Sequence, residues 1–151
     1  VACTRQIADK FANGMEFFNT FGGNPVSCAI GKAVLQTVKQ EKLQENALKV
    51  GEYLKKGLID LSKKYPIIAD VRGQGLFLGF ELCDQYLNPL PEKVRYLANR
   101  MKEMSVLMSV DGPQYNVLKI KPPMVFRQAH ADELLEKLSK VLKEDYLLQG
   151  S

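Results

Sequence analysis

Cysteine and histidine are scarce in this chain of 151 residues. Its three cysteines, Cys3, Cys28 and Cys83, lie far apart and form no CxxC pattern. Neither a disulfide framework nor a structural zinc site is therefore indicated, and we expect buried thiols in a reducing compartment. The single histidine, His130, has no neighbouring side chains with which to form a metal site or a nucleophilic pair, so we expect it at the surface.

Long apolar runs are also absent. No stretch approaches the length of a membrane span and no signal-peptide pattern is present, so no membrane partner is expected. The net charge is only +4, and lysines are interleaved with glutamates without a basic stripe that carries aromatic residues. Nucleic acid is therefore not expected as a partner. The hydrophobic share of 46% is enough for one domain with a modest core.

Helical and strand patterns follow one another from Pro25 onward. Apolar residues at a 3.6-residue period predict helices over residues 25–40, 43–63 and 92–104, and from Ala131 onward. Strands are predicted over residues 67–72, 76–82, 105–110 and 116–120, the first two joined by a tight turn at residues 73–75. This order predicts an α/β fold of the two-layer α+β type, a small, mostly antiparallel sheet with helices on one side.

A loop precedes the first of these helices. Residues 17–25 read FFNTFGGNP, in which Asn24 suits the N-cap of the helix and Pro25 its first position. The unpaired amides and the positive dipole end of such a helix attract phosphate, and the Thr20 hydroxyl is placed to join them. Taken alone, this pattern is also typical of a purely architectural turn.

Four ordered motifs extend this interpretation. They are residues 19–29 (NTFGGNPVSCA), 43–51 (LQENALKVG), 71–82 (VRGQGLFLGFEL) and 117–124 (VLKIKPPM). Together they resemble the class III aminotransferases, pyridoxal-phosphate enzymes of fold type I, over nearly the whole chain. The resemblance implies the C-terminal part of such an enzyme. Residues 1–24 would then be the end of the large domain with the cofactor-phosphate loop, and residues 25–151 an interdomain helix and the C-terminal small domain.

The resemblance also implies a cofactor contact. The threonine that matches Thr20 reaches across the interface of a homodimer and hydrogen-bonds the phosphate of pyridoxal 5'-phosphate held by the neighbouring subunit. The residue that matches Asn19 lies beside it and adds a contact. The lysine that forms the Schiff base with the cofactor lies, in the family, upstream of the part that matches Val1. We therefore assign no catalytic residue here and expect the chain alone to be inactive.

Lys119 departs from the pattern of many class III aminotransferases. Those enzymes carry an arginine at this position, and it grips the substrate carboxylate with two hydrogen bonds. Lysine lacks the planar fork of guanidinium but suits phosphate as a point charge. The surrounding run resembles the phospho-lyase branch of the family, which acts on ethanolamine phosphate or 5-phosphohydroxylysine. Lys119 is thus predicted to bind substrate. The alternative is that Lys119 and Lys121 are ordinary surface lysines. Arg72 is predicted to have a structural role in the hairpin.

Three functions follow from the resemblance. The first is a phospho-lyase that converts a small phosphorylated amine to an aldehyde, ammonia and phosphate. The second is a class III aminotransferase that passes an amino group to a keto acid such as pyruvate or glyoxylate. The third is a non-catalytic dimerisation module. A cytoplasmic location is expected, with the mitochondrion as the alternative.

Overall fold

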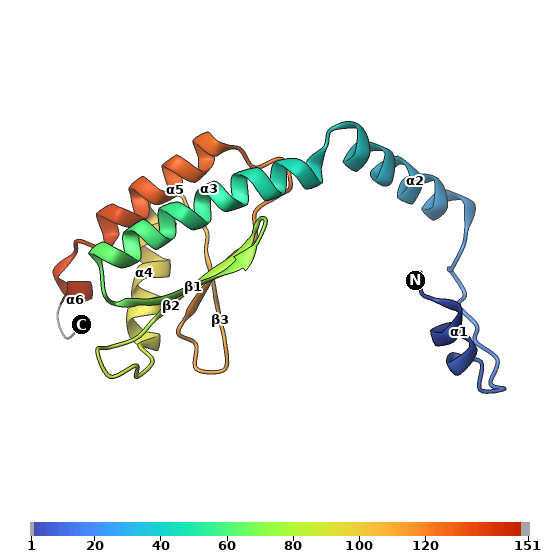
Figure 1. Ribbon diagram of the computed structural model, residues 1–151, viewed down its shortest axis with the longest axis horizontal. Coiled ribbons are helices and arrows are strands. Elements are labelled where there is room, and N and C mark those ends of the chain that lie inside the picture. Colours follow the sequence, from blue (N-terminus) through green and yellow to red (C-terminus); the bar gives the residue numbers. More distant parts are fainter. Residues whose placement is uncertain (1, 149–151) are drawn as a thin grey trace. The chain divides into compact units, whose positions relative to one another are not determined.

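The computed structural model describes residues 2–148 of the chain. These residues fall into two compact units, Val1–Gln36 and Thr37–Ser151, and each is described by itself. Figure 1 shows the elements of both units in sequence colours. Within the described residues, no helix combines the length and the apolar character needed to cross a membrane.

The first unit contains few elements. Helix α1 (Arg5–Phe11), which the sequence did not predict, is followed by a loop and by α2 (Pro25–Gln40), whose last turn belongs to the second unit. No described residue of this unit is buried. Its exposed large apolar side chains are Ile7, Phe11, Met15, Phe17, Phe18, Phe21, Val26, Ile30, Val34 and Leu35. The described part of this unit therefore has no hydrophobic core of its own.

The second unit is a four-stranded antiparallel sheet covered by helices. The strands are β1 (Ile68–Gln74), β2 (Phe77–Leu82), β3 (Ser109–Asp111) and β4 (Val117–Ile120), in the order β1-β2-β4-β3. The helices are α3 (Leu43–Lys64), α4 (Pro91–Glu103), α5 (Gln128–Val141) and the short α6 (Asp145–Leu148). The predicted mixed fold with a small antiparallel sheet is confirmed.

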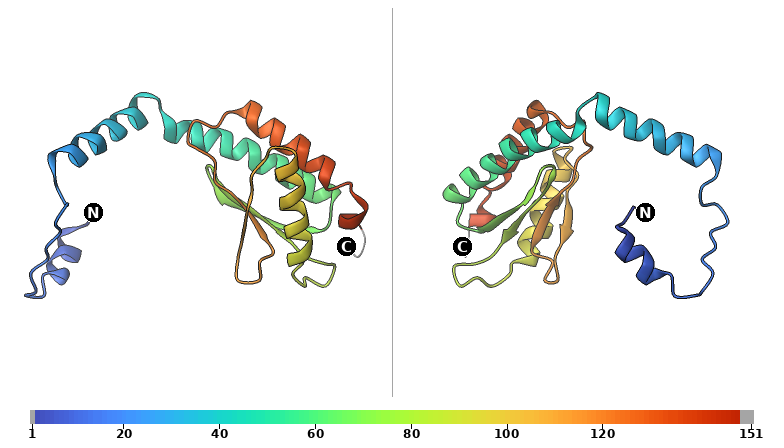
Figure 2. Two further views of the ribbon diagram at one scale, coloured as in Figure 1. Left: turned by 180° about the vertical axis from the view of Figure 1, so that it is seen from behind. Right: turned by 45° about the vertical axis from the view of Figure 1, so that its right-hand side comes forward.

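One core joins the sheet to the helices. Alternate strand residues such as Phe80 and Leu118 are fully buried, and they share one apolar cluster with Leu58 of α3, Leu97 of α4 and Leu138 of α5. Helices α3 and α5 run side by side along the sheet (Figure 2). Because the strand side chains alternate between the two faces, the charged residues of the strands lie on the other face.

Several predicted boundaries were wrong by a few residues. Gln74 pairs with Phe77, so the two-residue turn is Gly75–Leu76 and not residues 73–75. Gly75 has a φ of +55°, which suits the first position of a type II′ turn.

Two further boundaries were moved by helix caps. Helix α4 ends at Glu103, and the amides of Ser105 and Val106, which follow it, donate to the carbonyls of Lys102 and Met101. These two residues therefore cap the helix, and β3 begins only at Ser109. Helix α5 begins at Gln128, three residues before the predicted start, because the His130 ring nitrogen Nδ1 accepts a bond from the Arg127 amide.

The first turns of α3 hold two neighbouring segments in place. A Cβ atom added at Gly51 would lie 2.0 Å from the carbonyl oxygen of Gly75, so the helix passes directly against the hairpin turn. The side-chain amide of Asn46 donates to the carbonyls of Met124 at 2.8 Å and Phe126 at 3.0 Å. These contacts fix the chain that follows β4.

Candidate functional site

The loop before α2 contains both predicted cofactor residues. Asn19 uses its side-chain oxygen internally, since Oδ1 accepts hydrogen bonds from the amides of Phe21 (3.3 Å) and Gly22 (3.0 Å). Among the described residues, neither the Asn19 Nδ2 group nor the Thr20 hydroxyl has a hydrogen-bond partner. Both groups are therefore available to an external acceptor such as a phosphate oxygen.

Asn24 caps α2 as predicted. Its Oδ1 accepts a bond from the Ser27 amide at 2.9 Å, and its Nδ2 donates to the Phe21 carbonyl at 2.7 Å. Asn24 and Asn19 thus brace the turn from its two ends. Since the side chains occupy the amides of Phe21, Gly22 and Ser27, a phosphate would meet the Thr20 hydroxyl and the Asn19 Nδ2 group instead of a ring of free amides.

A second region lies on the face of the sheet that the helices leave open. Here a hollow of about 1020 Å³ is bounded by the hairpin, the start of α3 and the end of β4. Gly79 lies between Arg72 on β1 and Lys119 on β4, because the three residues are direct partners across the strands. Because glycine has no side chain, the floor of the hollow carries no side chain between those of Arg72 and Lys119.

Arg72 forms ion pairs with two carboxylates on the exposed face of the sheet. Its Nη1 donates to Asp70 Oδ2 at 2.5 Å and to Glu81 Oε2 at 2.8 Å. The buried Asn116 donates to the other Glu81 oxygen at 2.8 Å. The hydrogen bond from Arg72 is the main cause that holds the pKa of Glu81 below its usual value, and Asn116 adds to it. This geometry agrees with the structural role predicted for Arg72.

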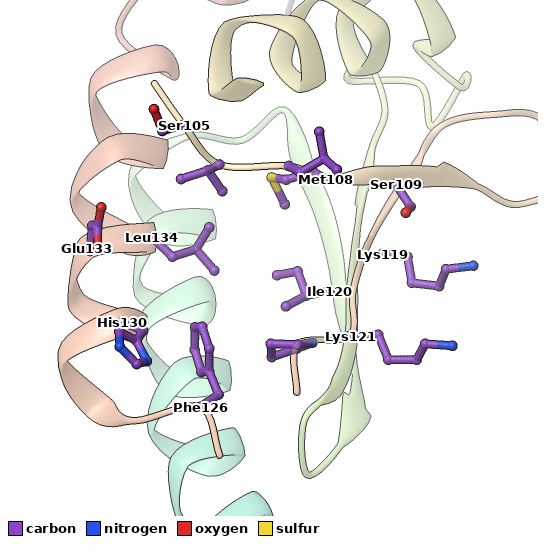
Figure 3. Close-up of a pocket in the computed structure, with 13 residues that line it drawn as sticks. Ser105, Met108, Ser109, Lys119, Ile120, Lys121, Phe126, His130, Glu133 and Leu134 are labelled. Atoms are coloured by element: carbon purple, nitrogen blue, oxygen red, sulfur yellow. The ribbon is translucent and has the colours of Figure 1, made fainter. Parts of the chain in front are cut away.

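Lys119 and Lys121 project from one side of the chain at the end of β4. Figure 3 shows both side chains extending away from Phe126 and Leu134, while Ile120 between them points toward these residues. Both lysines line the hollow on the open face. The Lys119 ammonium forms an ion pair with Asp111 of β3, and this hydrogen bond lowers the pKa of Asp111. Lys121 has no such partner among residues 2–148.

A smaller hollow of about 560 Å³ lies on the helix side of β4 (Figure 3). His130 and Glu133 of α5 line it together with Met108 and Phe126. His130 is exposed, as predicted, and its ring is used as a helix cap. No group of three or more His, Cys, Asp or Glu side chains in the described part of the chain is arranged to hold a metal ion.

The cysteines correct one prediction. Cys83 is buried, and burial is the main cause that raises the pKa of its thiol. Cys3 and Cys28 are exposed, because the first unit buries none of its described residues. The expectation of three buried thiols was therefore wrong for these two.

Three residues beside the site were not assigned from the sequence. Asp111 was seen only as part of a turn, although it pairs with Lys119. Lys121 was considered only as a surface lysine, although the Lys-x-Lys spacing in a strand already places both lysines on one face. Asn46 lies within a family motif, but its contact with the segment after β4 spans 78 and 80 residues and has no local signal.

The chain resembles known proteins along most of its length. The model of the family described as "Aminotransferase class-III" matches residues 1–142. An alanine–glyoxylate aminotransferase 2-like protein of Drosophila melanogaster is 45% identical in an alignment of 152 positions that covers 95% of this chain and 31% of that protein. Ethanolamine-phosphate phospho-lyase homolog 1 of Caenorhabditis elegans is 39% identical in an alignment of 145 positions that covers 94% of this chain and 31% of that protein.

A solved structure shows the same fold. It is a phospholyase from Arthrobacter in complex with phosphoethanolamine, with a TM-score of 0.85 and 42% identity over 92% of this chain and 33% of that one. This chain thus spans about a third of the length of the relatives it matches. The match over residues 1–142 shows that the chain belongs to the class III aminotransferases, a family of pyridoxal-phosphate enzymes of fold type I.

Proposed function

We propose that this chain is the C-terminal part of a phospho-lyase that eliminates phosphate from a small phosphorylated amine. The observation that carries the proposal is Lys119, a lysine at the anion-binding position of the family, on the open face of the sheet beside a large hollow. The Caenorhabditis relative named for ethanolamine phosphate and the Arthrobacter structure with phosphoethanolamine support the same substrate class. Ethanolamine phosphate and 5-phosphohydroxylysine are the candidate substrates.

The loop fits one end of the cofactor. In a homodimer, the free hydroxyl of Thr20 would donate to the phosphate of pyridoxal phosphate held by the neighbouring subunit, and the Nδ2 group of Asn19 would add a second donor. The cofactor supplies an electron sink for the carbon next to the substrate nitrogen. The division into residues 1–24, with this loop, and residues 25–151, with the small domain, is part of the proposal.

In this scheme Lys119 would bind the phosphate group that leaves the substrate. When the carbon–oxygen bond to phosphate breaks, the phosphate takes the electron pair and gains negative charge. The Lys119 ammonium, held beside the hollow by Asp111, would donate hydrogen bonds to the phosphate as that charge develops. Water then converts the remaining unsaturated amine to an aldehyde and ammonia, so one phosphate, one ammonia and one aldehyde leave for each amine consumed.

A class III aminotransferase is the second candidate. The Drosophila relative, which is 45% identical, bears an aminotransferase name, so identity does not separate the two activities. An aminotransferase would need no leaving group on the substrate and would use a keto acid as the acceptor. In that case Lys119 would bind a carboxylate with one ammonium group instead of a guanidinium fork.

A dimerisation module without catalysis is the third candidate. The exposed apolar residues of the first unit favour it, because surfaces of this kind mark contacts with other chains or domains. Under either enzyme hypothesis the chain alone is inactive, since the family's cofactor lysine is not among its residues. A cytoplasmic location is also part of the proposal.

The acceptor dependence of the full-length protein separates the candidates. We would load it with pyridoxal phosphate and supply ethanolamine phosphate or phosphohydroxylysine, with and without pyruvate or glyoxylate. A phospho-lyase releases phosphate in both conditions. An aminotransferase forms the amino acid of the acceptor only when the keto acid is present, and a module does neither.

A further inference from the structure

We infer that Lys121 is a second phosphate-binding residue and the one that sets the preference for phosphorylated substrates. The inference rests on the proposed phospho-lyase function. It names a residue for which the sequence motif gave only a surface role. Lys121 follows β4 directly and lines the hollow on the open face together with Lys119.

The two lysines are placed to act on one anion. They are two positions apart in extended chain, with one residue between them, so their Cα atoms lie roughly 6.5 Å apart and their side chains leave the same face. Figure 3 shows the two side chains extending in parallel, with Ile120 turned to the core. A tetrahedral phosphate offers several acceptor oxygens and can receive bonds from both ammonium groups, whereas a carboxylate offers two.

Charge pairing separates the two lysines. The Lys119 ammonium is matched by the Asp111 carboxylate, so this pair offers hydrogen-bond donors with little net charge. Lys121 has no carboxylate partner among the described residues. Arg72, which also lines the hollow, is neutralised by Asp70 and Glu81. Of the three cations that line the hollow, Lys121 is thus the one that no carboxylate among the described residues pairs.

The surrounding chain holds Lys121 in place. Pro122 and Pro123 follow it and restrict the backbone, and Asn46 fixes the carbonyls of Met124 and Phe126. Gly79 contributes no side chain to the floor beside Lys119. A Cβ there would meet Leu118 O and Val117 Cγ1 at 3.4 Å, an ordinary contact, so the absence of a side chain at Gly79 leaves room and does not reflect a forbidden geometry.

Steady-state kinetics on the full-length holoenzyme test the inference. We compare Lys121→Met, Lys121→Arg and Asp111→Asn, with Lys102→Met as a control that removes the same charge from the exposed face of α4. Lys121→Met should raise the KM for ethanolamine phosphate about tenfold, with kcat and the cofactor absorbance little changed, because a charge-assisted bond to the substrate is lost. Inhibition by inorganic phosphate should weaken by a similar factor.

The other variants sharpen the test. Lys121→Arg should restore most of the affinity, Asp111→Asn should lower the KM because Lys119 is released from its partner, and Lys102→Met should match the unsubstituted enzyme. If Lys121→Met leaves the KM and the phosphate inhibition within twofold while phosphate is still released, the inference is wrong and the proposed function stands. If the unsubstituted enzyme releases no phosphate, both fall together.

Discussion

At the residue scale, what each polar side chain already binds decides what it can offer a ligand. Asn19 illustrates this, because its oxygen is committed to the turn while its NH₂ group is free among the described residues. Lys119 is committed to Asp111, whereas Lys121 is not. These differences come from partners across turns and strands, so residue type alone does not show them.

The Thr20 hydroxyl gives the first prediction. Replacing Thr20 by Val keeps the shape of the side chain and removes the donor, so the full-length dimer should bind pyridoxal phosphate roughly 2- to 12-fold less tightly, from a loss of about 0.5–1.5 kcal/mol. Titration of the apoenzyme with the cofactor, followed by absorbance, measures this affinity. Thr20→Ser keeps the hydroxyl and should bind nearly as well as the unsubstituted protein. Equal affinities for the Val and Ser variants would show that Thr20 only shapes the turn.

Part of the site could be predicted at this scale and part could not. Thr20, Asn19 and Lys119 were proposed from short motifs, and their roles stay predictions. The Asp111 partner of Lys119 depends on the register between β3 and β4, which pairs Ser109 with Lys119. A three-residue strand next to a loop carries too few alternating residues to fix that register from sequence.

At the element scale, α3 organises the second unit. It packs along β1 and α5, and its glycines allow close approach at two points, Gly51 against the hairpin turn and Gly57 against Leu135. Apart from the short α6, which was not predicted, the helices and strands of this unit were predicted in the right order, because apolar periodicity and turn residues are local signals. The errors lie at ends such as residues 105–108, where helix capping by backbone groups competes with strand formation.

Gly51 provides the second prediction. In Gly51→Ala the new methyl group would lie 2.0 Å from the Gly75 carbonyl oxygen, so α3 and the hairpin must separate. We expect a loss of roughly 3 kcal/mol, at the upper end of the cost of overpacking. Urea unfolding of the chain, followed by circular dichroism, measures it.

Gly31→Ala is the matched control for this variant. It also replaces a helical glycine, but nothing lies within 4 Å of the added Cβ. The change should leave stability unchanged or raise it by about 0.5–1 kcal/mol through helix propensity. Equal unfolding midpoints for Gly51→Ala and the unsubstituted chain would contradict the close approach of α3 to the turn.

At the scale of the whole molecule, the two units differ in how they are stabilised. The second unit has a continuous core, while the described part of the first has none and exposes its large apolar side chains. Sequence reasoning found apolar residues in both units and did not separate buried from exposed ones in α2. In the structure α2 buries none of its residues, so the apolar period of this helix does not mark a buried face.

Acid stability gives the third prediction. Arg72 lowers the pKa of Glu81, and Arg100 lowers that of Glu144, so the folded chain binds these protons less readily than the unfolded chain. The stability from both groups is therefore complete above the ordinary glutamate pKa of 4.5 and is lost as the pH falls through the lower folded values. Thermal midpoints of the chain between neutral and acidic pH should decline in that range.

Two arginine variants test the cause of this decline. Arg72→Met removes the main partner of Glu81 and should make the acid decline shallower, because the folded and unfolded pKa values of that carboxyl approach one another. Arg95→Met removes only an exposed pair with Glu92 and should leave the slope as it was. Parallel curves for the Arg72 variant and the unsubstituted chain would rule out this ion pair as a source of the pH dependence.

The most direct measurement of the central claim is the stoichiometry of the products. The full-length protein, loaded with pyridoxal phosphate, is incubated with ethanolamine phosphate without any keto acid, and phosphate and ammonia are followed over time. A phospho-lyase should release both at equal rates, with one equivalent of aldehyde. Amino transfer that begins only after pyruvate is added, with no phosphate released before or after, would contradict the account and make the chain part of an ordinary class III aminotransferase.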